Sequence, residues 1–245
     1  LEDAYEQGKL MGAFAELCVD KYSFSREEMD AFAVESVTRA QKAVTAGVFS
    51  AEIAPVTLTT RKGEEVIALD ETPMKCDASK ISKLKPAFKK DGAVTPANSS
   101  SISDGAAAFV LMRESDARSR GITPLARIVG HATFAHDPAW FTTAPVFAFQ
   151  NLLKKVGWQT TDVDLWEINE AFAAVTMASM RDLGLPHDKV NVNGGACALG
   201  HPIGATGSRI LVTLLYALQA RGLKRGIAGL CAGGGEATAI AIEVL

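Results

Sequence analysis

The sequence predicts an α/β fold in which helices pack against a mostly parallel sheet. Three observations indicate this class. Segments typical of strands alternate with segments typical of helices over residues 105–245. One apolar run, Ala106–Met112, is continuous, as in a strand that is buried on both faces. The 245 residues are 48% hydrophobic and 22% charged, which suits a globular protein with a substantial core.

The chain is expected to begin with two helices and a hairpin. Apolar residues at helical spacing predict a helix within Asp3–Val19. Ser25, with a glutamate three residues later, forms a capping-box pattern, and the helix that it starts is expected to end before Gly47. The alternating Ile53–Thr60 and the apolar Val66–Leu69, with a turn between them, predict a hairpin.

Residues 70–102 interrupt the regular pattern. They contain three prolines, the polar run Asn98–Ser101 and six lysines between Lys75 and Lys90. Such a composition is typical of binding loops that extend from a core. The lysines either form a solvated surface or attract a polyanionic ligand such as the phosphate tail of a nucleotide, and the residues alone leave both readings open.

The second half alternates between the two kinds of element. Strands are expected at Ala106–Met112, Leu125–Phe134, Asp164–Ile168, Gly226–Cys231 and Ala237–Val244. Helices are expected at Glu114–Arg120, Ala144–Val156, Glu170–Leu183 and Pro202–Ala220. A strand–helix order of this kind is what favours the α/β class.

Composition excludes several kinds of protein. The formal net charge of −3 argues against a nucleic-acid partner, because such domains usually carry a basic excess. No apolar run approaches the length of a membrane span. The four cysteines form no CxxC pair, so a zinc or redox motif is not expected, and free thiols in a reducing, cytoplasmic compartment are the favoured reading.

The opening residues, Leu1–Tyr5, are polar and helix-like, and no initiator methionine or apolar leader precedes them. We therefore expect the chain to begin partway through a larger protein.

Three segments of the second half have residues suited to catalysis. The first is Asn169–Phe172, at the junction of a predicted strand and helix, where polar residues of α/β sheets commonly face a ligand. Alternatively, Asn169 or Glu170 only caps the following helix.

The second segment, Asn193–Gly207, surrounds His201 with glycines and precedes a long helix. Glycine lets a backbone approach a ligand closely. A histidine at a helix N-terminus is favoured in its neutral form by the helix dipole, which suits a base or a hydrogen-bond donor. The segment lacks the lysine of a phosphate loop, and its spacing is not that of a dinucleotide-binding loop.

The third segment is Cys231–Gly235, which closes a buried strand. Cys231 is either a small apolar core residue or a reactive thiol. The three glycines that follow it let backbone N–H groups converge, as in an oxyanion hole.

Together, and in this order, the three segments closely resemble the motifs of the thiolase family. Earlier segments extend the resemblance to essentially the whole chain: Asp3–Gly12 is similar to the start of the thiolase loop domain, Lys85–Phe88 and Thr95–Ser100 to its coenzyme A loops, and Asp104–Ala108 to the strand that returns to the first core domain. The related ketoacyl synthases use two histidines with their cysteine, a pattern that this chain does not show.

The resemblance implies a layered αβαβα fold, of which this chain would hold the complete C-terminal core domain and the loop domain. The implied domains are a coenzyme A-binding loop domain at residues 1–102, a returning strand and helix at 103–120, and the C-terminal core at 121–245. The first core domain, with the nucleophilic cysteine, is expected to be missing, so that the chain alone would be inactive and Ala106–Met112 would lack its sheet partners.

The resemblance also implies a reaction and its residues. Thiolases make or cleave a 3-ketoacyl-CoA by a reversible Claisen exchange. Cys231 would be the acid/base, with a pKa brought near neutrality. His201 would donate to the thioester oxygen and help activate the nucleophile, Asn169 would hold a water in the first oxyanion hole, and the N–H of Gly233 would serve the second.

The implied contacts to coenzyme A or the acyl group are Met11, Leu84, Phe88, Ser100, Phe141, Ala171 and Phe172. Many acetyl-CoA-specific members have His-Met-Gly where this chain has Leu10–Gly12, and the aromatic pair Trp140–Phe141 stands where the family shapes its acyl pocket. Both differences concern the substrate. No metal or cofactor is implied beyond the coenzyme A thioesters themselves, and the full-length protein is expected to be a homodimer or homotetramer. The alternative is a non-catalytic acyl-CoA-binding or scaffold fragment.

Overall fold

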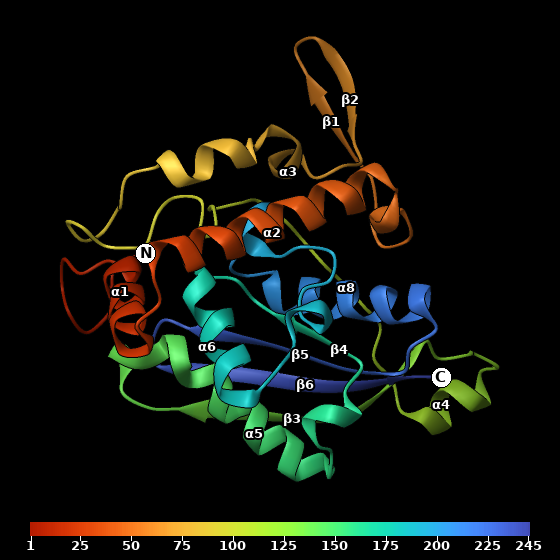
Figure 1. Ribbon diagram of the computed structural model, residues 1–245. Coiled ribbons are helices and arrows are strands. Elements are labelled where there is room, and N and C mark those ends of the chain that lie inside the picture. Colours follow the sequence, from red (N-terminus) through yellow and green to blue (C-terminus); the bar gives the residue numbers. More distant parts are fainter.

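The computed structural model describes residues 1–245 and contains a four-stranded sheet and a separate two-stranded hairpin (Figure 1). The strands are β1 Val56–Thr60, β2 Gly63–Ile67, β3 Ala126–Ala135, β4 Leu165–Ile168, β5 Arg225–Ala232 and β6 Glu236–Val244. The α-helices are α1 Met11–Tyr22, α2 Arg26–Thr45, α3 Glu71–Lys75, α4 Glu114–Ser119, α5 Ala144–Val156, α6 Ala173–Leu183, α7 Ala196–Leu199 and α8 Thr206–Arg221. None of the helices has the length and apolarity needed to cross a membrane.

The larger sheet has the strand order β3-β6-β5-β4 and is a mixed sheet, in which three of the four strands run in the direction expected of a mostly parallel sheet. The pair β4–β5 is the one parallel pairing, and β6 alone is reversed, so that it is antiparallel to both of its neighbours, β3 and β5. The short connection Gly233–Gly235 determines the direction of β6 relative to β5, because only antiparallel strands can be joined by so short a turn.

Helices cover both faces of this sheet, which confirms the layered α/β arrangement (Figure 1). On one face, α5 and the end of α6 pack against Trp166, Ile168 and Ile227. On the other face, α8 packs against Leu165 and Ala228. Residues 1–245 form one large sheet, so a second sheet of the five-layer αβαβα arrangement is not formed within them.

The long helix α2 crosses above the sheet, and the hairpin β1–β2 projects beyond it (Figure 1). The predicted capping box is confirmed, because Ser25 accepts from the N–H of Glu28 while the Glu28 carboxylate accepts from the N–H of Ser25. Gly47 has φ of 68°, as expected just after a helix end. Helix α1 begins later than predicted, since residues before Met11 form a loop that is closed by a bridge between Glu2 and Leu10.

The predicted strand Ala106–Met112 is not formed. Residues 104–112 make no backbone hydrogen bond, and the side chains of Val110 and Leu111 are exposed. A strand needs a neighbour for its N–H and C=O groups, and no segment of residues 1–245 lies beside this one as a partner. The apolar run therefore indicates a segment that could form a buried strand, but residues 1–245 contain no neighbouring strand to pair with it.

Candidate active site

The carboxyl end of β4 leads directly into Asn169 and Glu170, which are both buried. Neither caps the next helix, because α6 begins at Ala173 with Phe172 as its N-cap residue. Helix capping is therefore not the reason for these side chains. The buried Asn169 Oδ1 has no hydrogen-bond partner in the protein, and its Nδ2 faces the ring of His201.

Glu170 connects three separate parts of the chain. Its carboxylate accepts from Ser36 Oγ of α2 at 2.7 Å, from Asn191 Nδ2 at 2.8 Å and from the N–H of Cys197 at 3.0 Å. A buried carboxylate is stable only where donors replace the water that it has lost, and three donors do so here. Glu170 thereby fixes the glycine-rich segment relative to α2.

Three glycines of that segment are required by protein packing. Gly194 has φ of 81° and lies against the carbonyl oxygen of Ser36. A side chain at Gly195 would collide with the carboxylate of Glu170. A side chain at Gly200 would collide with Ser103. Close approach was expected toward a ligand, but at these positions it is toward the protein itself.

His201 lies before α8, which begins at Thr206 and not at Pro202 as predicted. Its backbone N–H donates to Ser101 O at 3.0 Å. Its ring contacts Thr206 Oγ1 through Nδ1 at 2.6 Å and Asn169 Nδ2 through Nε2 at 3.5 Å. Burial, and secondly the positive charge of Arg209, lower the pKa of His201, which favours the neutral imidazole by causes other than the expected helix dipole.

Cys231 stands near the end of β5 and is buried, with 7% of its surface exposed. Burial raises its pKa to about 12, so the expected pKa near neutrality is not produced by residues of this chain, and the group is a protonated thiol. A pocket of about 540 Å³ adjoins it, over the ends of three strands. The pocket is lined by Thr133, Phe134, Ala135, Leu230, Cys231, Ala232, Glu236, Ala237 and Thr238.

The glycine turn after Cys231 lies under Met11 of α1. A Cβ placed on Gly233 would be 2.9 Å from Met11 Sδ, so a larger residue here would require the methionine side chain to shift. The N–H groups of Gly233 and Gly234 donate to no acceptor in the protein. They are therefore free to bind an oxyanion, as the sequence predicts for Gly233.

Aromatic side chains predicted to contact the substrate gather beside Cys231. Phe141 and Phe172 are buried in the same apolar cluster as Cys231, and Met11, Phe88 and Ala171 pack against that cluster. The Phe88 and Phe172 rings meet edge to face at 6.2 Å between centroids. This cluster joins α1, the lysine-rich loop and the Asn169–Phe172 segment.

The other two predicted contacts, Leu84 and Ser100, are held through the backbone. Ser100 donates to Ala171 O from both its N–H and its hydroxyl. Leu84 O accepts from Arg26 at 2.7 Å, and Arg26 is paired with Asp30. Leu84 is therefore held by α2, and Ser100 by the segment that precedes α6.

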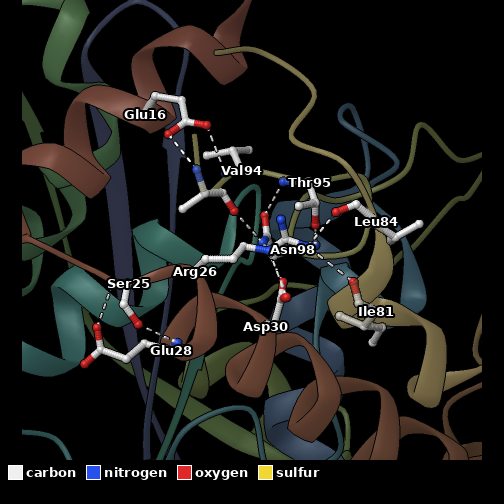
Figure 2. A network of polar contacts seen from close by, with 11 residues as sticks. Glu16, Ser25, Arg26, Glu28, Asp30, Ile81, Leu84, Val94, Thr95 and Asn98 are labelled. Atoms are coloured by element: carbon white, nitrogen blue, oxygen red, sulfur yellow. Dashed lines mark hydrogen bonds and ion pairs between the residues drawn. The ribbon is translucent and has the colours of Figure 1, made fainter. Parts of the chain in front are cut away.

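Figure 2 shows the network that fixes these loops. The buried Asn98 accepts from the N–H of Thr95 and donates to Asp30 and to Ala93 O. Glu16 of α1 accepts from the N–H groups of Ala93 and Val94. Residues 81–98 are thereby tied to α1 and α2.

The lysines of residues 75–90 divide into two groups. Lys75, Lys80 and Lys89 are paired with Glu71, Asp77 and Asp20. The remaining three, Lys83, Lys85 and Lys90, have no ion pair. Residues 85–91 line a surface pocket of about 550 Å³, so unpaired positive charge adjoins a hollow.

The structure thus forms two clusters from the predicted site residues. One joins Asn169 and His201 by direct contact, and the other places Cys231 among the aromatic side chains. His201 and Asn169 do not line the pocket that adjoins Cys231. The supporting residues Ser36, Asn98 and Thr206 were not predicted, because a single hydroxyl or amide gives no signal without its distant partner. No group of three or more His, Cys, Asp or Glu side chains is arranged to hold a metal ion.

Comparison with known families agrees with these motifs. The family model described as thiolase, N-terminal domain, matches residues 1–115, and the one described as thiolase, C-terminal domain, matches residues 122–244. The chain belongs to the thiolase family. Since residues 1–115 match the N-terminal domain of thiolases, the expectation that the chain lacks the first domain is wrong.

The alignments with similar proteins extend over the whole chain. A probable acetyl-CoA acetyltransferase of Dictyostelium discoideum is 48% identical over 100% of this chain and 59% of its own length, and the acetyl-CoA acetyltransferase of Thiocystis violacea is 48% identical over 100% and 62%. The chain therefore spans about three fifths of the length of the curated relatives that it matches.

Solved thiolase structures confirm the thiolase fold. The Bacillus anthracis acetyl-CoA acetyltransferase superposes with a TM-score of 0.97 at 47% identity, covering 100% of this chain and 62% of that one. Human mitochondrial 3-ketoacyl-CoA thiolase in complex with CoA gives 0.91 at 40% identity, covering 100% and 61%.

Proposed function

We propose that this chain supplies the proton-transfer, oxyanion-binding and coenzyme A-binding residues of an acetyl-CoA acetyltransferase. The contact between Asn169 and His201, next to the glycine-rich segment that Glu170 holds, carries the proposal. The two relatives that are 48% identical are a probable acetyl-CoA acetyltransferase and an acetyl-CoA acetyltransferase. The reaction would be the reversible exchange between two acetyl-CoA molecules and a 3-ketoacyl-CoA with free coenzyme A.

Each catalytic residue has a role that its surroundings support. In the cleavage direction the thiolate of the nucleophilic cysteine adds to the β carbonyl carbon, and the bond between the α and β carbons then breaks. The acyl group stays on the nucleophile as a thioester, the electron pair of the broken bond passes to the enolate of acetyl-CoA, and the thiol of Cys231 gives its proton to the α carbon. The raised pKa suits a proton donor, because the group enters this step protonated. His201, with a water held by Asn169, would stabilise one oxyanion, and the free N–H of Gly233 the other; removing one such donor typically costs about 10²–10³ in rate.

We further propose that the nucleophilic cysteine lies outside this chain. A nucleophile must reach the thiolate form, whereas burial raises the pKa of all four cysteines here. Cys18 is buried in the apolar cluster with a pKa of about 11, and Cys197 is packed against Glu170. On this proposal the chain alone is inactive.

Coenzyme A would bind across the loops of residues 81–100. The aromatic cluster beside Cys231 would receive the acyl and pantetheine part, and Lys83, Lys85 and Lys90 would attract the phosphates. Residues 1–102 would then be the loop domain and 121–245 the C-terminal core. A cytoplasmic homodimer or homotetramer remains part of the proposal for the full-length protein.

The test is an assay of acetoacetyl-CoA cleavage by the encoded protein with the residues upstream of Leu1 included. Cleavage that depends on coenzyme A is expected. If a folded protein with an upstream cysteine shows neither cleavage nor condensation yet binds coenzyme A, the alternative of a non-catalytic acyl-CoA-binding protein replaces the enzyme.

The role of Cys231 has its own test. Cys231→Ser in that protein is expected to slow the proton-transfer step about 10²–10⁴-fold while acyl-enzyme formation continues. Loss of acylation itself would show that Cys231 is the nucleophile.

A further inference from the structure

The imidazole of His201 contacts the hydroxyl of Thr206, and that hydroxyl donates its one hydrogen to another acceptor. Thr206 Oγ1, at the first position of α8, lies 2.6 Å from His201 Nδ1 and 2.9 Å from the carbonyl oxygen of Pro202. Thr206 is fully buried, so solvent does not compete for either contact.

The position of the proton follows from counting hydrogens. Pro202 O also accepts from the N–H groups of Ala205 at 2.8 Å and Thr206 at 2.9 Å. A carbonyl oxygen carries no hydrogen, so its 2.9 Å contact with Thr206 Oγ1 is a hydrogen bond only when the hydroxyl hydrogen lies between the two oxygens. Otherwise two lone pairs would face each other at hydrogen-bond distance. The hydroxyl then has no hydrogen left for His201, and the 2.6 Å contact must use a hydrogen on Nδ1.

The other ring nitrogen faces a donor. Asn169 Nδ2 lies 3.5 Å from His201 Nε2, at the outer limit of a hydrogen bond, while Asn169 Oδ1 is turned away from the ring and has no partner in the protein. An amide NH₂ group in this orientation can only donate. We propose that Thr206 is a positioning residue that fixes neutral His201 in the tautomer with its proton on Nδ1, so that Nε2 carries the lone pair. The catalytic consequence rests on the function proposed above, whereas the tautomer itself does not.

In this tautomer Nε2 can first accept a proton as a base and then donate it in a hydrogen bond to an oxyanion. In the first step, the S–H bond of an attacking thiol breaks, its electron pair stays on sulfur, and the proton forms an N–H bond at Nε2. In the second step, that same N–H donates to the oxyanion that forms when the thiolate attacks a thioester. Throughout, Nδ1–H donates to Thr206 and Thr206 donates to Pro202, so no other proton has to move. In the opposite tautomer Nε2 would begin with a proton and could not act as the base.

The decisive experiment is two-bond ¹H–¹⁵N correlation spectroscopy of the 245-residue chain labelled with ¹⁵N-histidine. The chain has an internal control, because His136 Nε2 lies 2.7 Å from Trp140 O and must therefore be protonated on Nε2. The expected spectrum shows His136 protonated on Nε2 and His201 on Nδ1, with His201 assigned by the signal missing from His201→Gln. A neutral His201 protonated on Nε2 would overturn the proposal.

Two variants test whether Thr206 is responsible. Thr206→Val keeps the shape but removes the acceptor, so His201 is expected to interconvert between tautomers, whereas Thr206→Ser keeps the Nδ1 form. An unchanged His201 pattern in a folded Thr206→Val protein would show that Thr206 does not set the tautomer. If Thr206→Val fails to fold, the wild-type and Thr206→Ser spectra still decide the tautomer.

Kinetics of the upstream-extended protein complete the test. Thr206→Val is expected to lower kcat for acetoacetyl-CoA cleavage about 10- to 100-fold, within the range of general acid–base effects, with KM nearly unchanged and with rescue by Thr206→Ser. A change in KM alone would contradict a positioning role. If the spectra are as expected but the wild-type protein has no activity, the proposed function fails and the tautomer assignment stands.

Discussion

Ser36 of α2 donates a hydrogen bond of 2.7 Å to Glu170, which is 134 residues away in the sequence. The same hydroxyl accepts from the N–H of Gly195 at 3.0 Å. All three residues are buried or held in buried contacts, so this one hydroxyl connects α2, the end of β4 and the glycine-rich segment.

Ser36→Ala is therefore expected to destabilise the protein. The change leaves a buried N–H without an acceptor and a buried carboxylate with one donor fewer, at a cost of about 1–3 kcal/mol. Chemical denaturation of both proteins measures the difference in the free energy of unfolding. Ser50→Ala, at an exposed serine, is the matched control and should change that free energy by less than about 0.5 kcal/mol. Equal effects of the two changes would show that the Ser36 contacts contribute nothing.

Gly195 and Gly204 offer a comparison within one segment. A methyl group on Gly195 would collide with the Glu170 carboxylate, whereas one on Gly204 would meet no atom within 4 Å. Gly195→Ala is expected to lower the free energy of unfolding by about 1–3 kcal/mol through overpacking. Gly204→Ala should be neutral or stabilising, because it restricts the unfolded chain. Unfolding curves of the two variants check this order, and a reversed order would contradict the packing given for Gly195.

The sequence was informative where one segment determines its own structure. The capping box at Ser25 and the end of α5 at Gly157 were predicted, because the residues responsible lie within a few positions of each other. The reversed direction of β6 was not predicted, although the short glycine turn that determines it was visible in the sequence.

Long-range partners explain most of what could not be predicted about the site. His201, Asn169, Cys231 and Gly233 were proposed as site residues from motifs, but the pKa of Cys231 depends on how deeply side chains from α1 and α6 bury it. Thr206 can accept from His201 because its own hydroxyl hydrogen is donated to Pro202 O. The spacing of residues in a motif does not predict such an arrangement.

Glu167 gives a prediction for the dependence of stability on pH. Burial raises its pKa to about 8, with like charge from Glu170 and Glu52 adding to the shift and Arg209 opposing it. Between the ordinary pKa of 4.5 and about 8 the folded protein holds a proton that the unfolded chain has lost. The folded state therefore binds more protons, and the free energy of unfolding falls as the pH rises through this window, by at most about 1.4 kcal/mol per pH unit for this group.

Glu167→Gln should remove this contribution. Unfolding measured at intervals from pH 5 to about pH 8 should give a shallower decline for the variant than for the wild type. Glu64→Gln, on the exposed hairpin, is the control and should follow the wild type. Parallel curves for wild type and Glu167→Gln would mean that Glu167 titrates alike in the folded and unfolded chains.

Arg26 links helix α2 to the loop proposed to bind coenzyme A (Figure 2). It donates to Leu84 O and Ile81 O and pairs with Asp30, which in turn accepts from Asn98. Arg26→Met would remove the hydrogen bonds that Arg26 donates to Leu84 O, Ile81 O and Asp30. Asp30 would then keep only its hydrogen bond from Asn98, and the loop of Leu84 would be free to move. We expect a loss of about 1–3 kcal/mol in the free energy of unfolding, since hydrogen bonds to a charged group are lost.

Coenzyme A affinity separates a local role of Arg26 from a general loss of stability. Titration calorimetry of the folded chain should give a Kd for coenzyme A about tenfold higher in Arg26→Met, equivalent to about 1.4 kcal/mol. Arg61→Met, in the turn of the hairpin, removes a positive charge without touching the loop and should leave Kd unchanged. If Arg26→Met lowers stability but binds coenzyme A as tightly as the wild type, the loop of residues 81–84 does not form part of the coenzyme A site. If both variants bind more weakly to the same extent, net charge accounts for the loss, and the geometry of the loop does not.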